Sequence, residues 1–345
     1  MTTSQLPRRP HLAPGRTVLW RAPDSVQVGV GGAHAVVVEG LSAPLATLLR
    51  EMDGSRDTDD LVADAVAAGA DRADVVAVIG DLQAAGLVRD EPGPRGGRRT
   101  ALDVDLAVSS AHSGCSTAEL VRVRRGASVL VQGSGRVAVA LASALAAAGV
   151  GRVVVAAAGT VAPADVGTGY LPCDVGRPRA DAARDAVVRA APGVRTCAEG
   201  GRRPPHLVVL ADSVVPDPVV AIDLVVRRRP HLAVHAHEGL AAVGPLVLPG
   251  RTSCLRCVEL RRADQDPAWP KLAAQLTAAP PTADLACTQV AAALGAEQVL
   301  AALAGPEASS RPPVWGATLE LDPVRGVLHR RTWAVHPRCG CGALG

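Results

Sequence analysis

The pattern of apolar positions along the chain predicts two regions with different folds. Before residue 92, three short β-type runs at residues 17–20, 25–30 and 35–38 are separated by Pro-Asp and Gly-Gly turn signals. Apolar residues at helical spacing follow in three groups, which include Leu45, Leu61 and Val75. Three short strands followed by three helices are typical of a small, winged-helix-like α+β domain.

After residue 128 the apolar runs alternate between strand length and helix length. Strands are expected at 129–131, 153–156, 207–211, 232–235 and 243–248, and helices at 137–148, 179–190, 218–228 and 284–304. A hairpin at 314–335 is expected to turn at Asp322 and Pro323. Nearly continuous apolar strands alternating with helices favour an α/β fold with a parallel, doubly wound, Rossmann-like sheet. A Gly-, Pro- and Arg-rich segment at 92–100 indicates a linker. We therefore expect a first domain at 1–92, a linker and entry helix at 93–127, and a Rossmann-like domain at 128–345.

Composition excludes several classes of protein. Of the 345 residues, 48% are hydrophobic and 20% charged, as in ordinary globular proteins. The net charge of +3 is too small to predict nucleic-acid binding. The longest apolar stretch, 137–150, is shorter than the roughly 20 residues of a membrane helix, and the first residues lack the apolar segment of a signal peptide. We expect a cytoplasmic protein with no membrane partner, whose eight cysteines are thiols or metal ligands rather than disulfides.

A glycine loop lies between an expected strand and an expected helix. Gly133 and Gly135 are followed by Ala138 in the third position of the loop pattern. Small residues there let a phosphate approach the backbone N–H groups at a helix N-terminus. The next strand, however, ends in Ala157 with no acid to hold a ribose. The loop therefore either binds a nucleotide or is a glycine turn kept for packing.

Two close pairs of cysteines predict a metal site. Cys254 and Cys257 form the first pair, and Cys339 and Cys341 the second. Two such pairs can close a tetrahedral, structural Cys₄ zinc site. The alternatives are two redox dithiols or free cysteines, and His336 is a less favoured ligand.

Other chemistry-bearing residues give weaker signals. Asp212 follows an apolar strand, where α/β folds place their chemistry, and is either a metal ligand or an N-cap for the next helix. Cys287 begins a helix and is either a nucleophile or part of the core. His235 and His237 alternate on a strand and either line a cleft or have structural roles. Sequence spacing gives no partner to Cys115, Cys173 and Cys197.

With the glycine loop, Asp212 and the cysteine pairs, the chain from about residue 128 resembles the ThiF/MoeB superfamily, relatives of ubiquitin-activating enzymes. The stretches SCLRCVELRRADQDPAWP and HPRCGCG resemble the actinobacterial branch related to cyclodehydratase partner proteins of thiazole/oxazole-modified microcin pathways. RPHLAPGRTVLW, MDGSRDTDDL and LQAAGLV resemble the PqqD-like element that binds leader peptides. The resemblance implies a ThiF-type sheet with a structural zinc, ATP and Mg²⁺ as cofactors, and a homodimer.

The resemblance also implies positions for the ATP contacts. The ribose Asp of the family falls on Ala157, a phosphate-contacting Arg on Thr168, and a phosphate-binding Lys on Arg179. Asp212 falls at or next to the magnesium-binding Asp. Three of four contacts are therefore changed, and a guanidinium does not replace a compact ammonium in a tight phosphate site.

Two functions follow as hypotheses. In the first, the chain is a non-catalytic scaffold whose first domain binds a peptide or small protein by strand addition at 26–30 or 36–38, with Arg72 or Arg89 meeting an acidic leader and a separate protein carrying the catalysis. In the second, Gly133, Gly135, Arg179 and Asp212 form a rewired adenylyltransferase site that activates a carboxylate. NAD-dependent redox chemistry is disfavoured because no ribose acid is present.

Overall fold

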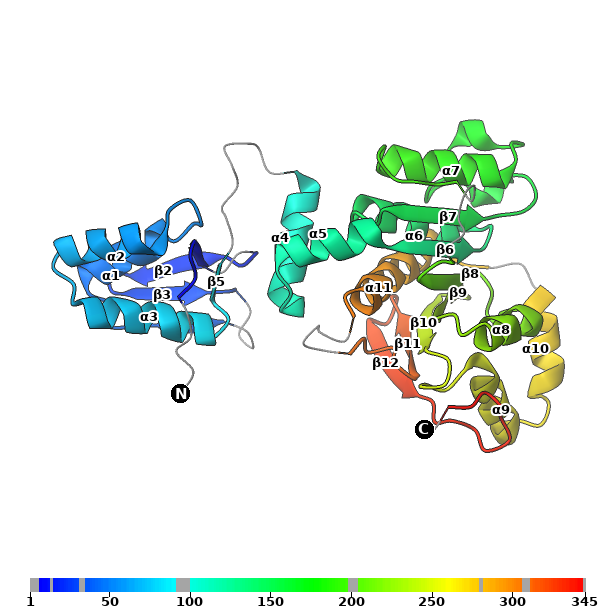
Figure 1. Ribbon diagram of the computed structural model, residues 1–345. Helices are drawn as coiled ribbons and strands as arrows, with labels where there is room; N and C mark the ends of the chain where they lie inside the picture. Colours follow the sequence, from blue (N-terminus) through cyan, green and yellow to red (C-terminus); the bar gives the residue numbers. More distant parts are fainter. Residues whose placement is uncertain are drawn as a thin grey trace. The chain divides into compact units, whose positions relative to one another are not determined.

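The computed structural model describes residues 6–12, 15–30, 35–90, 100–197, 204–278, 282–305 and 311–343 (Figure 1). The chain divides into two compact units, Met1–Val121 and Arg122–Gly345. Each unit is described by itself. Of the expected linker at 92–100, only Thr100 lies within the described residues.

The first unit contains two small antiparallel sheets. In the three-stranded sheet, β3 (Ser25–Val28) lies between β2 (Val18–Ala22) and β4 (Val36–Val38). A two-stranded sheet pairs β1 (Pro10–Leu12) with β5 (Val88–Asp90). The first sheet agrees with the sequence prediction, whereas β1 (PHL) and β5 (VRD) were not predicted because neither contains a run of apolar residues.

Three helices cover the core of the first unit: α1 (Ala43–Glu51), α2 (Thr58–Ala67) and α3 (Arg72–Ala84). A fourth helix, α4 (Ala101–Ser113), contributes no residue to this core. Leu45, Leu61 and Val75 from the first three helices pack in one core with Val26 and Val28 of β3, as their helical spacing predicts. Helix α4 begins with a reciprocal capping box between Thr100 and Asp103, and α5 (Thr117–Gly126) crosses the boundary between the units.

The second unit is built on a seven-stranded mixed sheet. Its order is β12-β11-β10-β9-β8-β6-β7. The strands are β6 (Ser128–Gln132), β7 (Arg152–Ala156), β8 (Leu207–Ala211), β9 (His231–His237), β10 (Leu240–Val247), β11 (Ala317–Asp322) and β12 (Val327–Thr332). Strands β7, β6, β8 and β9 are parallel, and β10 to β12 continue the sheet antiparallel. The parallel, doubly wound arrangement predicted from the sequence is therefore confirmed for four strands, whereas β10 to β12 make the sheet mixed. The predicted hairpin of β11 and β12 is also confirmed.

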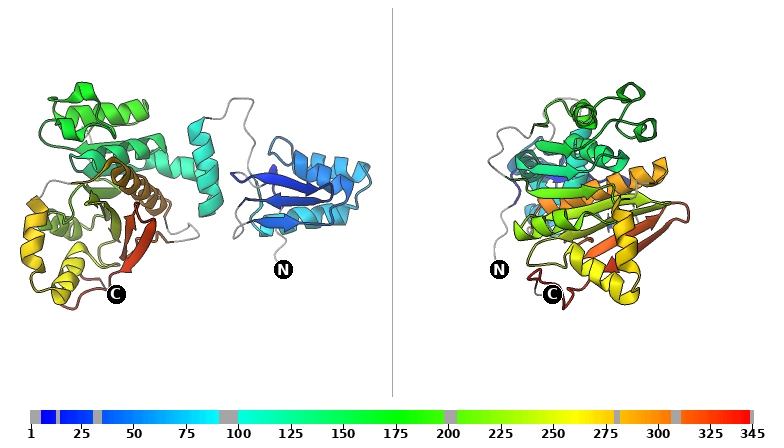
Figure 2. Two further views of the ribbon diagram at one scale, coloured as in Figure 1. Left: turned by 180° about the vertical axis from the view of Figure 1, so that it is seen from behind. Right: turned by 90° about the vertical axis from the view of Figure 1, so that its right-hand side faces the viewer.

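Helices cover both faces of this sheet. They are α6 (Arg136–Ala147), α7 (Arg179–Ala190), α8 (Pro218–Val226), α9 (Leu255–Gln265), α10 (Trp269–Ala278) and α11 (Leu285–Leu303), with short 3₁₀ turns at Pro163–Asp165 and Pro172–Asp174. Figures 1 and 2 draw α8, α9 and α10 together on the side of the sheet away from α11. In β8, Leu207 and Val209 pack in the core with α6 and α11, whereas Val208 and Leu210 pack in the core with α8 and α9. Both faces of the strand are buried, which explains its continuous apolar sequence.

Helix α11 is the long Ala-rich helix predicted at 284–304. Its 19 residues are on average apolar enough, and numerous enough, to cross a membrane. In the structure it packs against α6, β9 and β10, and Ala291, Gly295 and Val299 are buried. A Cβ added to Gly295 would lie 2.8 Å from the Leu141 side chain of α6. Tight packing therefore explains the small, apolar face of this helix.

Candidate functional site

A loop with two glycines joins β6 to α6. Gly133 and Gly135 flank Ser134, and Gly135 is the N-cap of α6. A Cβ added to either glycine would lie 2.7 Å from a carboxylate oxygen of Asp212. The close approach of this side chain from the end of the adjacent strand β8 therefore requires both glycines.

Asp212 caps α6 from the end of β8. Its carboxylate accepts hydrogen bonds from the backbone N–H groups of Gly135 at 2.8 Å, Val137 at 3.1 Å and Ala138 at 3.4 Å. These are the orphan donors of a helix N-terminus, and the helix dipole favours a negative charge at the same place. The following helix α8 has its own N-cap, Asp217. The interpretation of Asp212 as the cap of the next helix is therefore wrong.

The Asp212 carboxyl is held in an unusual environment. The residue is 9% exposed and its backbone has a φ of 72°, which few residues other than Gly, Asn and Asp adopt. Burial raises its pKa, and the hydrogen bonds from the α6 backbone act in the opposite direction. A buried carboxyl on a strained backbone at the end of a parallel strand marks this edge of the sheet as the candidate site.

Arg179 lies at the start of α7, beside the glycine loop. Its Nε and Nη2 donate to Oδ2 of Asp165 at 3.1 and 2.7 Å, and its Nη1 lies 3.4 Å from the Ala158 carbonyl oxygen. The Ala158 N–H donates to Oγ of Ser134 at 2.9 Å, which connects this group to the loop. The predicted nucleotide-site residues thus meet at one edge of the sheet: Gly133, Gly135, Arg179 and Asp212. Sequence analysis missed Asp165, because nothing in its spacing marks it as the partner of Arg179.

Two further side chains hold the same loop. The hydroxyl of Tyr170 donates to the Ser134 carbonyl oxygen at 3.2 Å, and burial raises the pKa of this tyrosine. The Thr168 hydroxyl donates to the carbonyl oxygen of Arg136 at 3.0 Å. Arg136 itself donates to the Ala283 carbonyl oxygen. The only tyrosine of the chain was a signal that sequence analysis did not use.

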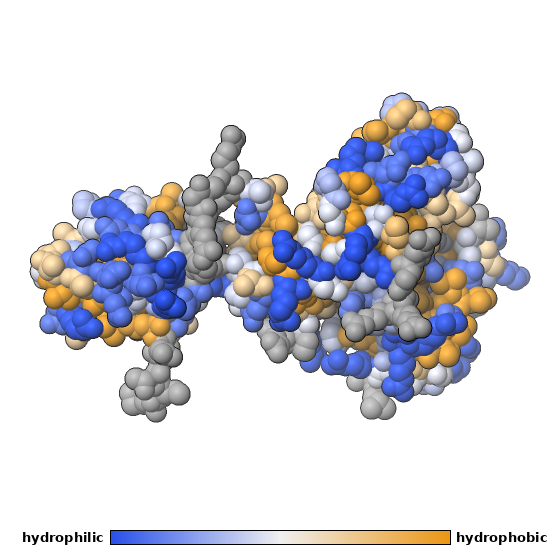
Figure 3. All heavy atoms as spheres, turned by 45° about the horizontal axis from the view of Figure 1, so that its top comes forward, coloured by the Kyte–Doolittle hydropathy of each residue, from blue (hydrophilic) through white to orange (hydrophobic). Residues whose placement is uncertain are grey.

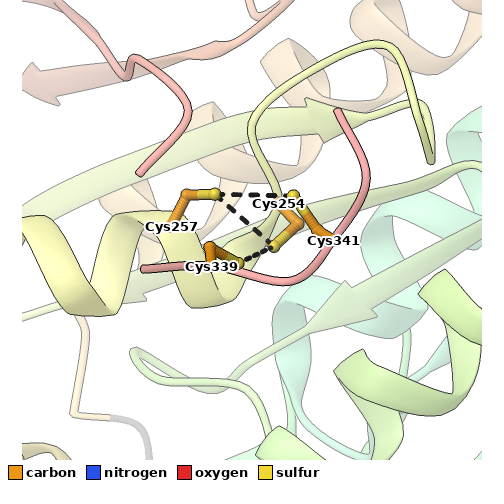
Figure 4. Close-up of side chains that lie close together, drawn as sticks. All are labelled: Cys254, Cys257, Cys339 and Cys341. Carbon is orange, nitrogen blue, oxygen red and sulfur yellow. Dashed lines mark hydrogen bonds between the residues drawn. The ribbon is translucent and has the colours of Figure 1, made fainter. Parts of the chain in front are cut away.

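The four predicted metal ligands form one cluster (Figure 4). The Sγ–Sγ distances are 3.8 Å for Cys254 and Cys257, 3.5 Å for Cys254 and Cys339, and 3.7 Å for Cys257 and Cys341. A tetrahedral zinc with Zn–S bonds of about 2.3 Å requires sulfur–sulfur separations of about 3.8 Å. The donor set and its geometry therefore fit a structural, four-thiolate zinc site.

His336 positions the second cysteine pair and is not a ligand. Its Nε2 lies 2.7 Å from Oδ2 of Asp264 in α9, and its Nδ1 accepts the N–H of Arg338 at 3.1 Å. Its backbone carbonyl oxygen accepts the N–H of Cys339 at 2.9 Å. Both ring nitrogens are engaged away from the cluster, so the residue holds the segment that carries the last two thiols.

The remaining predicted thiols do not form a second cluster in the part of the chain that the structure describes. Cys287 is fully buried at the start of α11, and burial raises its pKa to about 11. It is therefore a protonated core residue and not a nucleophile. Cys173 and Cys197 are exposed, and Cys115 is partly buried. His235 and His237 line a cavity on the opposite face of the sheet from α11.

These features define the class of protein. An α/β unit carries a glycine loop at one strand end and a four-cysteine cluster beside α9. The chain belongs to the ThiF family, whose model matches residues 114–342. This confirms the resemblance inferred from the sequence motifs.

Solved structures share this fold over nearly the whole chain. Escherichia coli MccB with AMPCPP and MccA has a TM-score of 0.72 at 15% identity, covering 96% of this chain and 99% of MccB. MccB with ATP has a TM-score of 0.71 at 16% identity, with coverages of 96% and 99%. PaaA has a TM-score of 0.68 at 14% identity, covering 92% of this chain and 98% of PaaA. Among curated proteins, none matches the chain in sequence.

Proposed function

We propose that this ThiF-family chain recognises a peptide for a separate modifying enzyme and does not itself adenylate it. The observation that carries the proposal is the Asp212 carboxylate, which already occupies the N–H groups at the start of α6. In an active nucleotide site these groups would be free for phosphate oxygens. The proposal follows the first of the two hypotheses drawn from the sequence.

ATP, which the family implies, does not fit this site as it stands. A phosphate oxygen about 4 Å from the Asp212 carboxylate would meet a repulsion of about 4 kcal/mol at an effective dielectric constant of about 20. Arg179, the remaining cation among the expected contacts, is neutralised by Asp165 at 2.7 Å. Ala157 supplies no carboxylate to hold a ribose. Three separate features of the site, at Asp212, Arg179 and Ala157, thus disfavour a bound nucleotide.

The first unit offers an edge strand for a peptide. Strand β3 lies between β2 and β4, so the expected strand addition at 26–30 is wrong: both of its edges are already paired. Strand β4 has β3 on one side and no partner on the other among the described residues, and its Val36 and Val37 are each 38% exposed. An apolar edge strand is a template for strand addition. This supports β4 as the binding edge.

The basic residues proposed to meet an acidic peptide differ in availability. Arg89 donates to Oγ of Ser110 at 2.5 Å and to the Cys115 carbonyl oxygen at 3.1 Å, so its guanidinium supports the first unit itself. Arg72 is exposed at the first position of α3. We therefore assign contact with an acidic leader to Arg72 rather than Arg89.

In this proposal the second unit is a docking body for the catalytic partner. The four-thiolate cluster would hold a structural zinc that ties the segment after β12 to α9, with no open position for catalysis. The homodimer that the family resemblance implies and the cytoplasmic location expected from the sequence are part of the same proposal.

The second candidate is an active ATP- and magnesium-dependent adenylyltransferase. The observation that favours it is that Gly133, Gly135, Arg179 and Asp212 meet at one edge of the sheet. It would require the Asp212 side chain to leave the N-terminus of α6 and Arg179 to leave Asp165. The glycines would then serve a ligand rather than the carboxylate.

The proposal can be tested with peptides that are selected from a random library for binding to the full chain. Alternate residues of an edge strand point their N–H groups towards and away from its neighbour, so one of Val36→Pro and Val37→Pro removes an outward N–H without breaking the pairing with β3. The variant that keeps the wild-type unfolding midpoint should lose peptide affinity, measured by fluorescence anisotropy. Val37→Thr, which keeps the backbone N–H at the same exposed position, is the matched control and should retain it. Unchanged affinity in both folded β4 variants would exclude this edge.

A further inference from the structure

A large cavity lies in the second unit, and its lining does not include the glycine loop. Its volume is about 1030 Å³, and it is lined by residues of α8, α9 and α10 and of strands β9 to β11. Ligand pockets in proteins span roughly 300–1,000 Å³ and are mostly apolar with a few polar groups. Figure 3 shows hydrophobic residues on the right-hand part of the second unit, the side on which Figure 1 draws α8 and α10.

The walls contributed by α8 and α10 are apolar. Ile222 and Val226 of α8 line the cavity and are 47% and 75% exposed, and Ala273 and Ala274 of α10 face it with small side chains. Such exposure of branched aliphatic side chains along one helix is costly in water. An apolar occupant would remove this cost.

Arg262 of α9 brings a cation into this apolar space. Its guanidinium lies over the ring of Trp269 at 4.8 Å and that of Trp333 at 5.6 Å from the ring centres. The nearest carboxylate oxygen, on Glu259, is 3.6 Å away, and none of the described residues accepts a hydrogen bond from Arg262. Its side chain is only 21% exposed. The guanidinium thus has an ion pair with Glu259 and no hydrogen bond to a described residue, which leaves N–H donors available to a ligand.

The aromatic rings around Arg262 are fixed. The indole N–H of Trp269 donates to Oε2 of Glu259 at 2.7 Å, and that of Trp333 donates to the Thr318 hydroxyl at 2.9 Å. Arg331 lies 5.6 Å from the Trp333 ring and 3.6 Å from Glu320. The guanidinium of Arg262 is thus held in place before any ligand arrives, which lowers the entropic cost of binding.

His235 of β9 adds a neutral polar group to the same cavity. Burial, together with the charges of Arg262 and His237, lowers its pKa to about 4, so the ring is uncharged at neutral pH. The structure records no hydrogen bond from its ring to any described residue. The neutral imidazole offers one donor and one acceptor to a polar group of a ligand.

We infer that this cavity binds an apolar molecule that ends in a carboxylate, with the carboxylate on Arg262 between Trp269 and Trp333 and the apolar part along α8 and α10. A planar carboxylate matches the fork of a guanidinium. Glu259 and Glu320 lie close enough to act on Arg262 and disfavour a doubly charged anion such as a phosphate ester. The site lies within the second unit, so it goes beyond the proposed peptide recognition by β4 and does not depend on it.

Two sources share this chemistry, and paired ligands distinguish them. Decanoate represents an acyl chain and is compared with decanol; the tripeptide Val-Leu-Leu represents an apolar peptide terminus and is compared with its carboxyl-terminal amide. Isothermal titration of the zinc-loaded full chain measures affinity. Emission of Trp269 and Trp333, two of four tryptophans, gives an independent readout. At least one acid should bind about tenfold or more tightly than its uncharged partner, because hydrogen bonds to charged groups are the stronger ones.

Variants separate the carboxylate contact from the apolar contact. Arg262→Gln should remove the preference for the acid, and Arg262→Lys should restore part of it. Arg227→Gln is the matched control, because Arg227 is an exposed arginine after α8 that does not line the cavity. It should leave the affinities for the acid and for its uncharged partner unchanged. Ala273→Trp should narrow the apolar part of the cavity along α10 and weaken binding of the acid even with Arg262 in place.

Each outcome decides the inference. Binding of decanoate alone identifies an acyl chain, and binding of the tripeptide alone identifies a peptide terminus. Equal affinity for acid and uncharged partner, or an unchanged preference in a folded Arg262→Gln protein, overturns it. The inference is also overturned if none of the four ligands binds. This includes the case in which sedimentation shows that a second copy of the chain covers the cavity.

Discussion

Replacing Asp212 with Ala should destabilise the second unit more than an ordinary helix cap does. The change removes the acceptor for the N–H groups of Gly135, Val137 and Ala138, two of them at good hydrogen-bond distances and the third at 3.4 Å. A buried donor left without a partner costs about 1–3 kcal/mol, so the expected loss of unfolding free energy is about 2–5 kcal/mol. An exposed N-cap is worth about 1 kcal/mol.

Asp217→Ala provides the matched control, because Asp217 is exposed and its side chain caps α8 through the N–H of Val219 at 2.8 Å. Urea unfolding at neutral pH with zinc present measures both variants. Fluorescence suits the assay, since Trp269, Trp315 and Trp333 lie in the second unit and report on it. If Asp212→Ala costs no more than Asp217→Ala, the carboxylate does not hold the start of α6 in solution, and the reasoning fails.

Three further predictions concern the loop, the metal cluster and an acidic turn. Gly135→Ala should cost about 1–3 kcal/mol because its Cβ would lie 2.7 Å from Oδ1 of Asp212; in the Asp212→Ala background this cost should largely vanish, and additive double-mutant energies would contradict the contact. Cys254→Ser should lower zinc content and reduce the unfolding midpoint by about 10 °C or more, because several kcal/mol of metal-linked folding energy are lost; the exposed Cys173→Ser should change neither, and full metal content in Cys254→Ser would exclude the site. Hydrogen bonds from the Leu171 N–H and from Arg177 keep the pKa of Asp174 below its ordinary value. Asp174 therefore stabilises the fold above its unfolded pKa of about 3.9, and this contribution is lost as the pH falls through the lower folded value. The difference in unfolding free energy between the wild type and Asp174→Asn should be constant above about pH 5 and shrink below about pH 4; a difference that does not change with pH would refute the assignment.

Local sequence patterns predicted the regular elements well. The helix Arg179–Ala190 and the strand Leu207–Ala211 have the predicted bounds, because their apolar residues follow one period and end at clear boundaries. Helices α9 and α10 were not predicted, since their charged and small residues give little periodicity. Helix α9 begins at the cysteine cluster, with Cys254 as its N-cap, and α10 packs against α9, so both depend on tertiary contacts.

The candidate site was predictable in its residues but not in its contacts. Gly133 and Asp212 each follow a parallel strand, and their contact depends on β6 and β8 being neighbours, which no local pattern reveals. Nothing in the sequence distinguishes Arg262 from the neighbouring Arg261 as a ligand-binding residue. The rings that hold it come from positions 269 and 333, so only the fold brings this group together.

The central claim is that the Asp212 carboxylate closes the nucleotide site. Isothermal titration of the zinc-loaded full chain with ATP and magnesium tests it most directly. We predict no saturable binding up to millimolar ATP. Saturable binding at micromolar ATP, about −8 kcal/mol, would contradict the account and favour an active adenylyltransferase.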